Sequence, residues 1–190
     1  MPANSPIKNW FLFALFLGFV IVDRSFTLIH FGFLFTDLDQ TVLWNGAMDY
    51  SRGVFHEPFF YGQAYNYMLE ALLAVPLLWL DTPVYKALPI ATSFLSIFPF
   101  VIFGFLLMKK DHPFWALLSL SIPIILPVEY GLLSTISRGF VQAHLFAPLL
   151  FLPLLNPSNR KNVIVLFIAA GACLIGNGSS LLIVVPIVIW

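Results

Sequence analysis

Apolar residues along this chain of 190 residues fall into runs that are separated by short polar segments. Four of the runs are long enough, or nearly long enough, to cross a hydrocarbon core of about 30 Å as helices, and two shorter runs follow them. The four are 9–30, 84–108, 113–128 and 139–155, and the two are 163–175 and 181–190. Backbone polar groups in lipid must be satisfied within the element that carries them. The pattern therefore predicts an all-α fold, a polytopic transmembrane helical bundle with about six crossing helices.

One further apolar run, 59–80, carries a regular polar stripe. Its polar residues Gln63, Asn66, Tyr67 and Glu70 recur at the spacing i, i+3, i+4 and i+7, which is one face of a single helix. In the lipid core this stripe would need partners along its whole length, because unsatisfied polar groups are costly there. We therefore expect the run to form a helix that lies at the membrane interface, within the first outer loop.

Basic residues near the ends of the runs test this topology, because Lys and Arg close to crossing helices prefer the cytoplasmic side. Two turns between predicted helices carry Lys109, Lys110, Arg160 and Lys161. These four fall outside if the N-terminus is inside and 59–80 crosses. They fall inside, together with Lys8, if 59–80 lies on the outer face. An outside N-terminus with a crossing 59–80 also puts the four inside and stays open, but the polar stripe favours the interfacial arrangement.

Composition and charge limit the classes of function. The chain is 60% hydrophobic and 9% charged, with a mean hydropathy of +0.93, whereas an ordinary soluble domain has roughly 25% charged residues. This composition disfavours a soluble fold. The formal net charge is zero, so nothing indicates a nucleic-acid partner. Cys173 is the single cysteine and has no partner for an internal disulfide, so we expect a small buried apolar residue.

The polar segment after the first run predicts a short capped helix. Asp37 and Gln40 stand three residues apart ahead of a periodic apolar stretch, and Gly53 follows that stretch. Asp37 fits the N-cap, Gln40 fits the reciprocal position of a capping box, and Gly53 fits the C-terminal end of the helix. Asp39 falls in the first turn, where the helix dipole also favours an acidic side chain.

The order of these features resembles a known family. A first apolar helix, an acidic pair, a short helix, the segment GVFHEPFFYGQ and an interfacial helix precede the second crossing helix. This arrangement resembles the GT-C fold of membrane glycosyltransferases, in particular the bacterial branch related to protein O-mannosyltransferases and lipid A aminoarabinose transferases. The resemblance implies that residues 1–190 form a single membrane-embedded domain, the N-terminal part of a longer GT-C module. It also implies a multi-pass protein of the bacterial inner (plasma) membrane, with the first loop on the periplasmic or outer face.

The same resemblance implies transfer of a sugar from a polyprenyl-phosphate donor to an acceptor on the outer face, with inversion. Asp39 matches the first acid of a family motif that reads Asp-Glu, and would be the general base or the group that positions the acceptor hydroxyl. Gln40 departs from the second acid, which disfavours a bridging metal, although Asp37 could supply a second carboxylate. Asp39 and Asp37 are therefore the catalytic candidates. No metal ligands are assigned, and a divalent metal stays open.

The proposed chemistry also needs groups that bind the substrate. A hydroxyl nucleophile needs a carboxylate to accept its proton, and a departing lipid phosphate needs a cation or a metal to balance its charge. Arg138, in the segment SRGF, is the candidate for the phosphate, and its alternative role is to anchor a helix at the headgroups. Glu129 is the one carboxylate of the second outer loop. The remaining candidates, which would contact phosphate or line a sugar-sized cleft, are His56, Glu57, Tyr61, Gln63, Asn66 and Glu70.

Two other classes of function stay open. A polytopic transporter or flippase-like carrier would use intramembrane charges such as Asp23 and Arg24, although we expect this pair to bind a neighbouring helix. An inactive membrane fragment would keep the first loop without the rest of an acceptor site. A carrier would carry polar groups along mid-membrane faces, whereas this chain gathers them in one outer loop. The glycosyltransferase is therefore the favoured hypothesis.

Overall fold

The structure is a computed structural model that describes residues 6–56, 61, 68–151 and 160–189. Within these residues the regular elements are helices and there is no strand, which confirms the all-α prediction. In chain order they are α1 (Pro6–Thr27), the π-helix η1 (Leu28–Gly32), α2 (Leu38–Ser51), α3 (Leu69–Trp79), α4 (Val84–Lys109), α5 (Pro113–Ile125), α6 (Val128–Leu133), the 3-10 helix η2 (Gln142–Leu145), α7 (Ala147–Leu150), α9 (Arg160–Gly176), the 3-10 helix η3 (Gly178–Ser180) and α10 (Leu181–Ile189).

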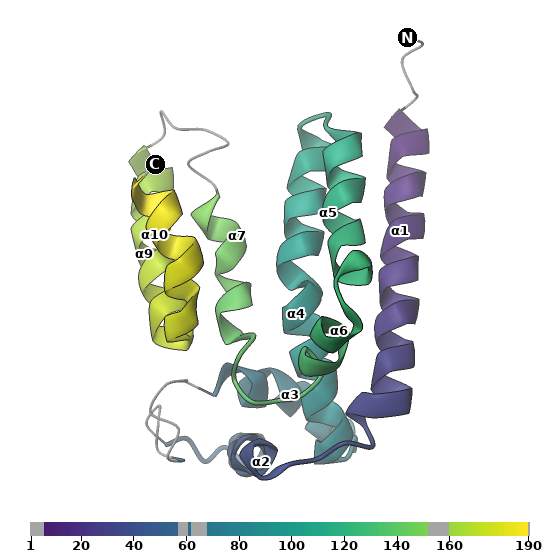
Figure 1. Cartoon of the computed structure of the whole chain (residues 1–190). Coiled ribbons are helices and arrows are strands. Elements are labelled where there is room, and N and C mark those ends of the chain that lie inside the picture. The colour runs from purple at the N-terminus through teal and green to yellow at the C-terminus, as the bar shows by residue number, and fades with distance from the viewer. Residues whose placement is uncertain (1–5, 57–60, 62–67, 152–159, 190) are drawn as a thin grey trace.

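Most of the helices run along a common axis, and α2 and α3 close one end of the bundle (Figure 1). One upright group contains α1, α4 and α5, and the other contains α7, α9 and α10. The start of α1, the α4–α5 turn and the start of α9 lie at the same end. The opposite end carries α2, which runs across the bundle axis, and α3 (Figure 1). The basic residues of the two predicted inner turns therefore share an end with the N-terminus, away from α2 and α3.

Three separate apolar clusters, rather than one core, hold the described helices together. The first cluster joins α2 and α3 to α4. It contains Leu43 of α2, Met68 just before α3, and Leu88 of α4. A second cluster joins η2, α7, α9 and α10, and a third joins α1, α4 and α5. Because α4 contributes to the first and third clusters, it fixes α2 and α3 against the end of the upright bundle.

Two helical stretches, Ile7–Gly32 and Val84–Lys109, are long and apolar enough to cross a membrane. Each has 26 residues, which corresponds to about 39 Å of helix against about 30 Å of hydrocarbon. Large apolar side chains are exposed on the outer faces of α1, α5, α9 and α10, among them Phe19, Phe114 and Ile168. Such a surface is unusual for a soluble monomer.

Two of the other predicted crossing runs differ from the helices that form. The run 113–128 ends as α5 at Ile125, because Pro127 favours an extended residue before it and Leu126 has ψ 152°. The run 139–155 opens with Gly139 at φ +82°, which is not a helical conformation, and continues as the 3-10 helix η2 and the short α7. Residues 152–159 of that run lie outside the described part of the chain.

The predicted helix over 59–80 is wrong as one continuous element. Met68 has φ 60°, a left-handed conformation through which an α-helix cannot continue, and α3 begins at Leu69. The Met68 side chain is buried in the first apolar cluster, close to Gly46 of α2, where an added Cβ would lie 2.5 Å from Met68 Cε. Burial of this side chain offsets a backbone conformation that costs about 1 kcal/mol or more. Tertiary packing thus overrides the helical spacing of the polar stripe.

The position of α3 nevertheless agrees with the interfacial arrangement. With 11 residues it is about 16 Å long, too short to cross a hydrocarbon core. The end of α1 and the start of α4 both lie at the end of the bundle that α3 closes (Figure 1). Of the four residues in the polar stripe, Gln63, Asn66 and Tyr67 lie outside the described residues, and only Glu70 can be followed in α3.

Candidate functional site

The helix α2 carries the two catalytic candidates at its N-terminal end. Asp37 is the N-cap, and its Oδ1 accepts a hydrogen bond from the Gln40 backbone N–H at 3.1 Å, as predicted. The reciprocal bond from the Gln40 side chain does not form, because that side chain is buried instead. Gly53 has φ +78° and its N–H bonds the Tyr50 carbonyl, so it ends the helix as predicted.

Arg138 reaches this end of α2 from a segment 101 residues further along the chain. Its Nη2 pairs directly with Asp37 Oδ2, and its Nε lies 3.8 Å from Asp39 Oδ2. The next residue, Gly139, has a positive φ that residues with a Cβ rarely adopt, so the turn that presents Arg138 needs glycine there. The structure therefore brings together three of the predicted residues, which we call the acid–arginine cluster: Asp37, Asp39 and Arg138.

The two carboxylates of the acid–arginine cluster differ in what they contact. Asp37 caps α2 with one oxygen and pairs with Arg138 through the other, and its side chain is 21% exposed. Asp39 lies at a longer distance from Arg138 and its side chain is 62% exposed. Arg138 Nε is buried and has no hydrogen-bond partner among the described residues. The cluster thus offers an accessible carboxylate beside a partly exposed guanidinium group.

The sequence predicts that Glu70 lines a sugar-sized cleft, but the structure buries the residue, which has 0% exposure. Its Oε2 accepts a hydrogen bond from Thr92 Oγ1 of α4 at 2.6 Å. Burial raises the pKa of Glu70 to about 7, and the Thr92 hydroxyl and the backbone amides of Gly139 and Val141 act in the opposite direction. Those amides face the carboxyl group, but Oε1 has no hydrogen bond of normal geometry among the described residues.

The other end of α2 holds a second set of predicted residues. Tyr61 donates its hydroxyl hydrogen to Asp49 Oδ2 at 2.5 Å, and His56 Nε2 lies 3.7 Å from the same oxygen. Burial and the Asp49 carboxylate raise the pKa of Tyr61 above its ordinary value. Ten residues of helix separate Asp39 from Asp49, which corresponds to about 15 Å. The structure therefore separates the Asp49 cluster (Asp49, His56 and Tyr61) from the acid–arginine cluster.

The remaining predicted residues do not join either cluster in the described part of the chain. Glu129 is exposed in the first turn of α6, and the structure shows no contact between it and the acid–arginine cluster. Glu57, Gln63 and Asn66 lie outside the described residues.

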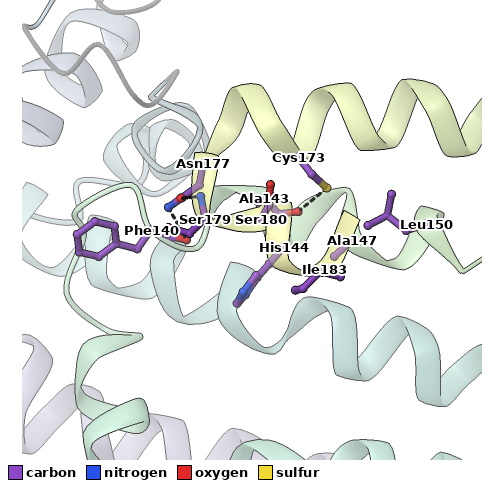
Figure 2. A pocket seen from close by; sticks show the side chains of 10 residues that line it. All are labelled: Phe140, Ala143, His144, Ala147, Leu150, Cys173, Asn177, Ser179, Ser180 and Ile183. Carbon is purple, nitrogen blue, oxygen red and sulfur yellow. Dashed lines mark hydrogen bonds between the residues drawn. The ribbon is translucent and has the colours of Figure 1, made fainter. Parts of the chain in front are cut away.

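A cavity of about 140 Å³ lies beside the segment that carries Arg138, where η2, α7, α9 and the turn before α10 meet (Figure 2). The Asn177 side chain holds the turn, because its Nδ2 donates to the Phe140 carbonyl at 3.4 Å and its Oδ1 accepts from the Ser179 N–H at 2.9 Å. His144 Nδ1 and Ser180 Oγ have no hydrogen-bond partner among the described residues. None of the predicted site residues that the structure describes lines this cavity.

A larger cavity, of about 410 Å³, lies between α1 and α6. Asp23 and Arg24 line it, and Arg24 Nη2 pairs with Asp23 Oδ2 at 2.5 Å. Arg24 also donates to the Gly131 carbonyl and to Ser134 Oγ, each at 3.4 Å. The predicted contact with a neighbouring helix is confirmed for Arg24.

The sequence did not predict the buried polar residues that hydrogen-bond within and next to the segment that carries Arg138. Thr92, Ser137 and Gln142 are buried completely, and each takes part in a hydrogen bond between segments far apart in the chain. Their one signal in the sequence is a polar residue inside or beside an apolar run, where burial requires a partner. Asp49, which accepts from Tyr61, was not among the predicted site residues either.

Among the described residues no group of three His, Cys, Asp or Glu side chains comes together in a way that could hold a metal ion. Comparisons of the chain with models of known protein families, with curated proteins and with solved structures found no match.

Proposed function

We propose that this chain is part of a membrane glycosyltransferase with a GT-C-like fold. It transfers a sugar from a polyprenyl-phosphate donor to an acceptor on the outer face of the bacterial inner membrane, with inversion. In this proposal about six helices cross the bilayer, and α2 and α3 lie at its outer surface. Asp39 is the general base and Arg138 binds the phosphate of the donor.

The observation that carries the proposal is the acid–arginine cluster itself. Arg138 Nε lies 3.8 Å from Asp39 Oδ2, the Arg138 side chain is 29% exposed, and most of the Asp39 side chain is exposed. A guanidinium group is well suited to phosphate oxygens, because its N–H groups match their geometry. A carboxylate beside the bound phosphate is in reach of a hydroxyl that attacks the adjoining sugar carbon. The two groups supply the two functions that the reaction requires.

In the reaction the acceptor hydroxyl oxygen attacks the anomeric carbon of the sugar from the side opposite to the phosphate. The bond from that carbon to the phosphate oxygen breaks, and its electron pair stays on the lipid phosphate. Asp39 accepts the hydroxyl proton as the new glycosidic bond forms, and Arg138 balances the charge that develops on the phosphate. Asp37 holds Arg138 in place and caps α2.

The arrangement of charges along the bundle supports the membrane orientation. By their places in the chain, Lys8, Lys109 and Lys110 lie at the end that contains the N-terminus, and the acid–arginine cluster lies at the opposite end (Figure 1). Basic residues near crossing helices favour the cytoplasmic side. The acid–arginine cluster would then face outward, where a lipid-linked sugar and an outer acceptor can meet.

A transfer assay with a matched pair of variants tests the proposal. Membranes that carry the full-length protein are incubated with a panel of radiolabelled polyprenyl-phosphate sugars, and the anomeric configuration of the product is determined. Transfer with inversion is expected for one donor. Arg138→Gln should reduce kcat/KM by about 100-fold or more, whereas Arg52→Gln, which removes an exposed cation at the C-terminal end of α2, should stay within about twofold of wild type. Equal losses in both variants would contradict a specific role for Arg138.

A carrier is the second candidate, and the cavity between α1 and α6 is the observation that favours it. This cavity is lined by the paired charges of Asp23 and Arg24 within a helix long enough to cross a membrane. Charges inside crossing helices often mark transport pathways. Uptake of labelled lipid-linked sugar into sealed vesicles, with no glycosidic product formed, would support the carrier and contradict the transferase.

A further inference from the structure

Glu70 is the most completely buried acidic residue of the described chain, and its surroundings consist of hydrogen-bond donors. Its side chain projects from the first turn of α3 and has 0% exposure. Thr92 Oγ1 of α4 donates to its Oε2 at 2.6 Å, and the backbone amides of Gly139 and Val141 face the carboxyl group from the segment beyond Arg138. Among the described residues, no charged side chain acts on the pKa of Glu70. Glu70 therefore faces hydroxyl and amide groups from α4 and from one loop, and no substrate could reach it without that loop moving.

A continuous chain of hydrogen bonds runs from Glu70 to the residue before Arg138. Thr92 Oγ1 lies 2.7 Å from Ser137 Oγ, and both side chains are fully buried. A hydroxyl has a single hydrogen to donate. When Glu70 is ionised and takes the Thr92 hydrogen, Ser137 must donate to Thr92. The direction of donation is then fixed from Ser137 through Thr92 to the carboxylate.

A second hydrogen bond ties the same loop to the start of α3. Gln142 Oε1 accepts from the Leu69 backbone N–H at 2.8 Å, and the Gln142 side chain is fully buried. This bond satisfies one of the backbone donors at the N-terminus of α3. The segment 137–142 is thus held against α4 at Ser137 and against α3 at Gln142, on both sides of Arg138, whose side chain reaches Asp37 at the start of α2.

We infer that Glu70 is a positioning residue, which acts through Thr92 and Ser137 to hold Arg138 against Asp37 and Asp39. The role of Arg138 in binding phosphate rests on the proposed function, but the positioning of the loop does not. Glu70 would then belong to the support of the site and would not contact the sugar. The raised pKa of its carboxyl group is the expected consequence of burial among donors without a cationic partner.

Hydrogen exchange of the full-length protein in lipid nanodiscs tests this inference at pH 8, where Glu70 is ionised. Thr92→Val removes the central hydroxyl and keeps the shape of the side chain, and Thr92→Ser keeps the hydroxyl. Glu70→Gln keeps the shape of Glu70 but replaces one carboxylate oxygen by an NH2 group, which cannot accept a hydrogen bond, and it removes the negative charge that fixes the direction of donation. Ser96→Ala is the matched control, because Ser96 is buried one turn along α4 and bonds only the Ser93 carbonyl of its own helix.

Loss of one buried hydrogen bond is expected to raise local opening, and hence exchange, by about tenfold. Amides of 139–142 should therefore exchange about tenfold faster in Thr92→Val and Glu70→Gln, and at the wild-type rate in Thr92→Ser and Ser96→Ala. Unchanged exchange in Thr92→Val and Glu70→Gln, or equal acceleration in Ser96→Ala, would overturn the inference. The readout does not depend on catalysis. A protein that shows this pattern but transfers no sugar would keep the positioning role and lose the proposed function.

Discussion

The two ends of helix α2 carry carboxylates whose partners lie at very different distances along the chain. At the N-terminal end Asp37 and Asp39 meet Arg138, which comes from a segment 101 residues away. At the C-terminal end Asp49 meets Tyr61 from a segment 12 residues away. A local contact can close a loop at little entropic cost, whereas a distant one must be supported by the packing of several helices. The long-range cluster is therefore the one whose geometry the whole fold maintains.

The two ends also differ in how their acids are engaged. The Asp49 side chain is 31% exposed and accepts a short hydrogen bond from Tyr61. The Asp39 side chain is twice as exposed, at 62%, and lies beside a cation without capping the helix. A carboxylate that is already used to hold a loop is a poor proton acceptor for a substrate, and an exposed one beside a phosphate-binding group is a good one.

The largest difference is expected in catalysis. Asp39→Asn removes the proton acceptor and should lower kcat of sugar transfer by about 100-fold to 10,000-fold, the usual range for a general base. Asp49→Asn makes the same chemical change at the other end of α2 and should lower kcat by about twofold or less. Transfer of labelled sugar by the two variants in the same membranes measures both effects. Comparable rates for the two variants would mean that the ends of α2 do not differ in function.

The second difference concerns the dependence of stability on pH. Among the described residues, the buried carboxyl group of Glu70 is connected through Thr92 and Ser137 to the loop that carries Arg138, which contacts the N-terminal end of α2. The pKa of Glu70 is raised from 4.5 to about 7 in the folded protein, so folding favours its protonated form. Stability from this group is fully present below about pH 4.5 and is lost as the pH rises through about 7, by up to about 3 kcal/mol.

Thermal unfolding in detergent across this pH range should therefore show a decline in the wild type. Glu70→Gln, which cannot ionise, should flatten the decline, and Asp49→Asn should leave it in place. A decline of the same size in Glu70→Gln would assign the pH dependence to another group.

A smaller effect is expected for the cap of α2. Asp37→Ala removes both the helix cap and the pair with Arg138 and should destabilise the protein by about 1–2 kcal/mol. Asp37→Asn retains an oxygen that can cap the helix and loses the charge, so it separates the two contributions. Chemical unfolding of the three proteins gives the difference. If Asn and Ala were equally destabilising, the ion pair rather than the cap would account for the loss.

The smallest effect is expected at the C-terminal end of α2. Tyr61→Phe removes the hydroxyl that donates to Asp49 and should cost about 1 kcal/mol or less, because the group is partly exposed. Its kcat of transfer should stay within about twofold of wild type. A large loss of transfer in Tyr61→Phe would bring the Asp49 cluster into the active site and remove the distinction between the ends.

The sequence predicts best what depends on local pattern. The cap at Asp37, the stop at Gly53 and the helical class of the chain follow from residue type and spacing, and the structure confirms all three. Arg138 was a candidate on chemical grounds, but its approach to Asp37 could not be predicted, because no local rule connects residues 101 positions apart.

The failures have an equally physical origin. The stripe that contains Glu70 has perfect helical spacing, but Met68 adopts a left-handed conformation so that its side chain can enter the cluster between α2 and α4. Spacing alone also suggested that Glu70 and Tyr61 face one cleft. The structure instead buries Glu70 against α4 and pairs Tyr61 with Asp49. Tertiary contacts determine where these side chains lie, and the spacing of residues along the sequence does not reveal such contacts.

In the proposed orientation the end of the bundle with the acid–arginine cluster faces outward, and the end with the α4–α5 turn faces the cytoplasm. Leu38, next to Asp39, is 85% exposed, and Asp111 is exposed in the α4–α5 turn at the other end. Each can be replaced by cysteine, because the native Cys173 is buried and serves as the background control. A membrane-impermeant maleimide applied to intact cells should label Leu38→Cys and leave Asp111→Cys unlabelled until the cells are opened. Labelling of Asp111→Cys but not Leu38→Cys in intact cells would contradict the account.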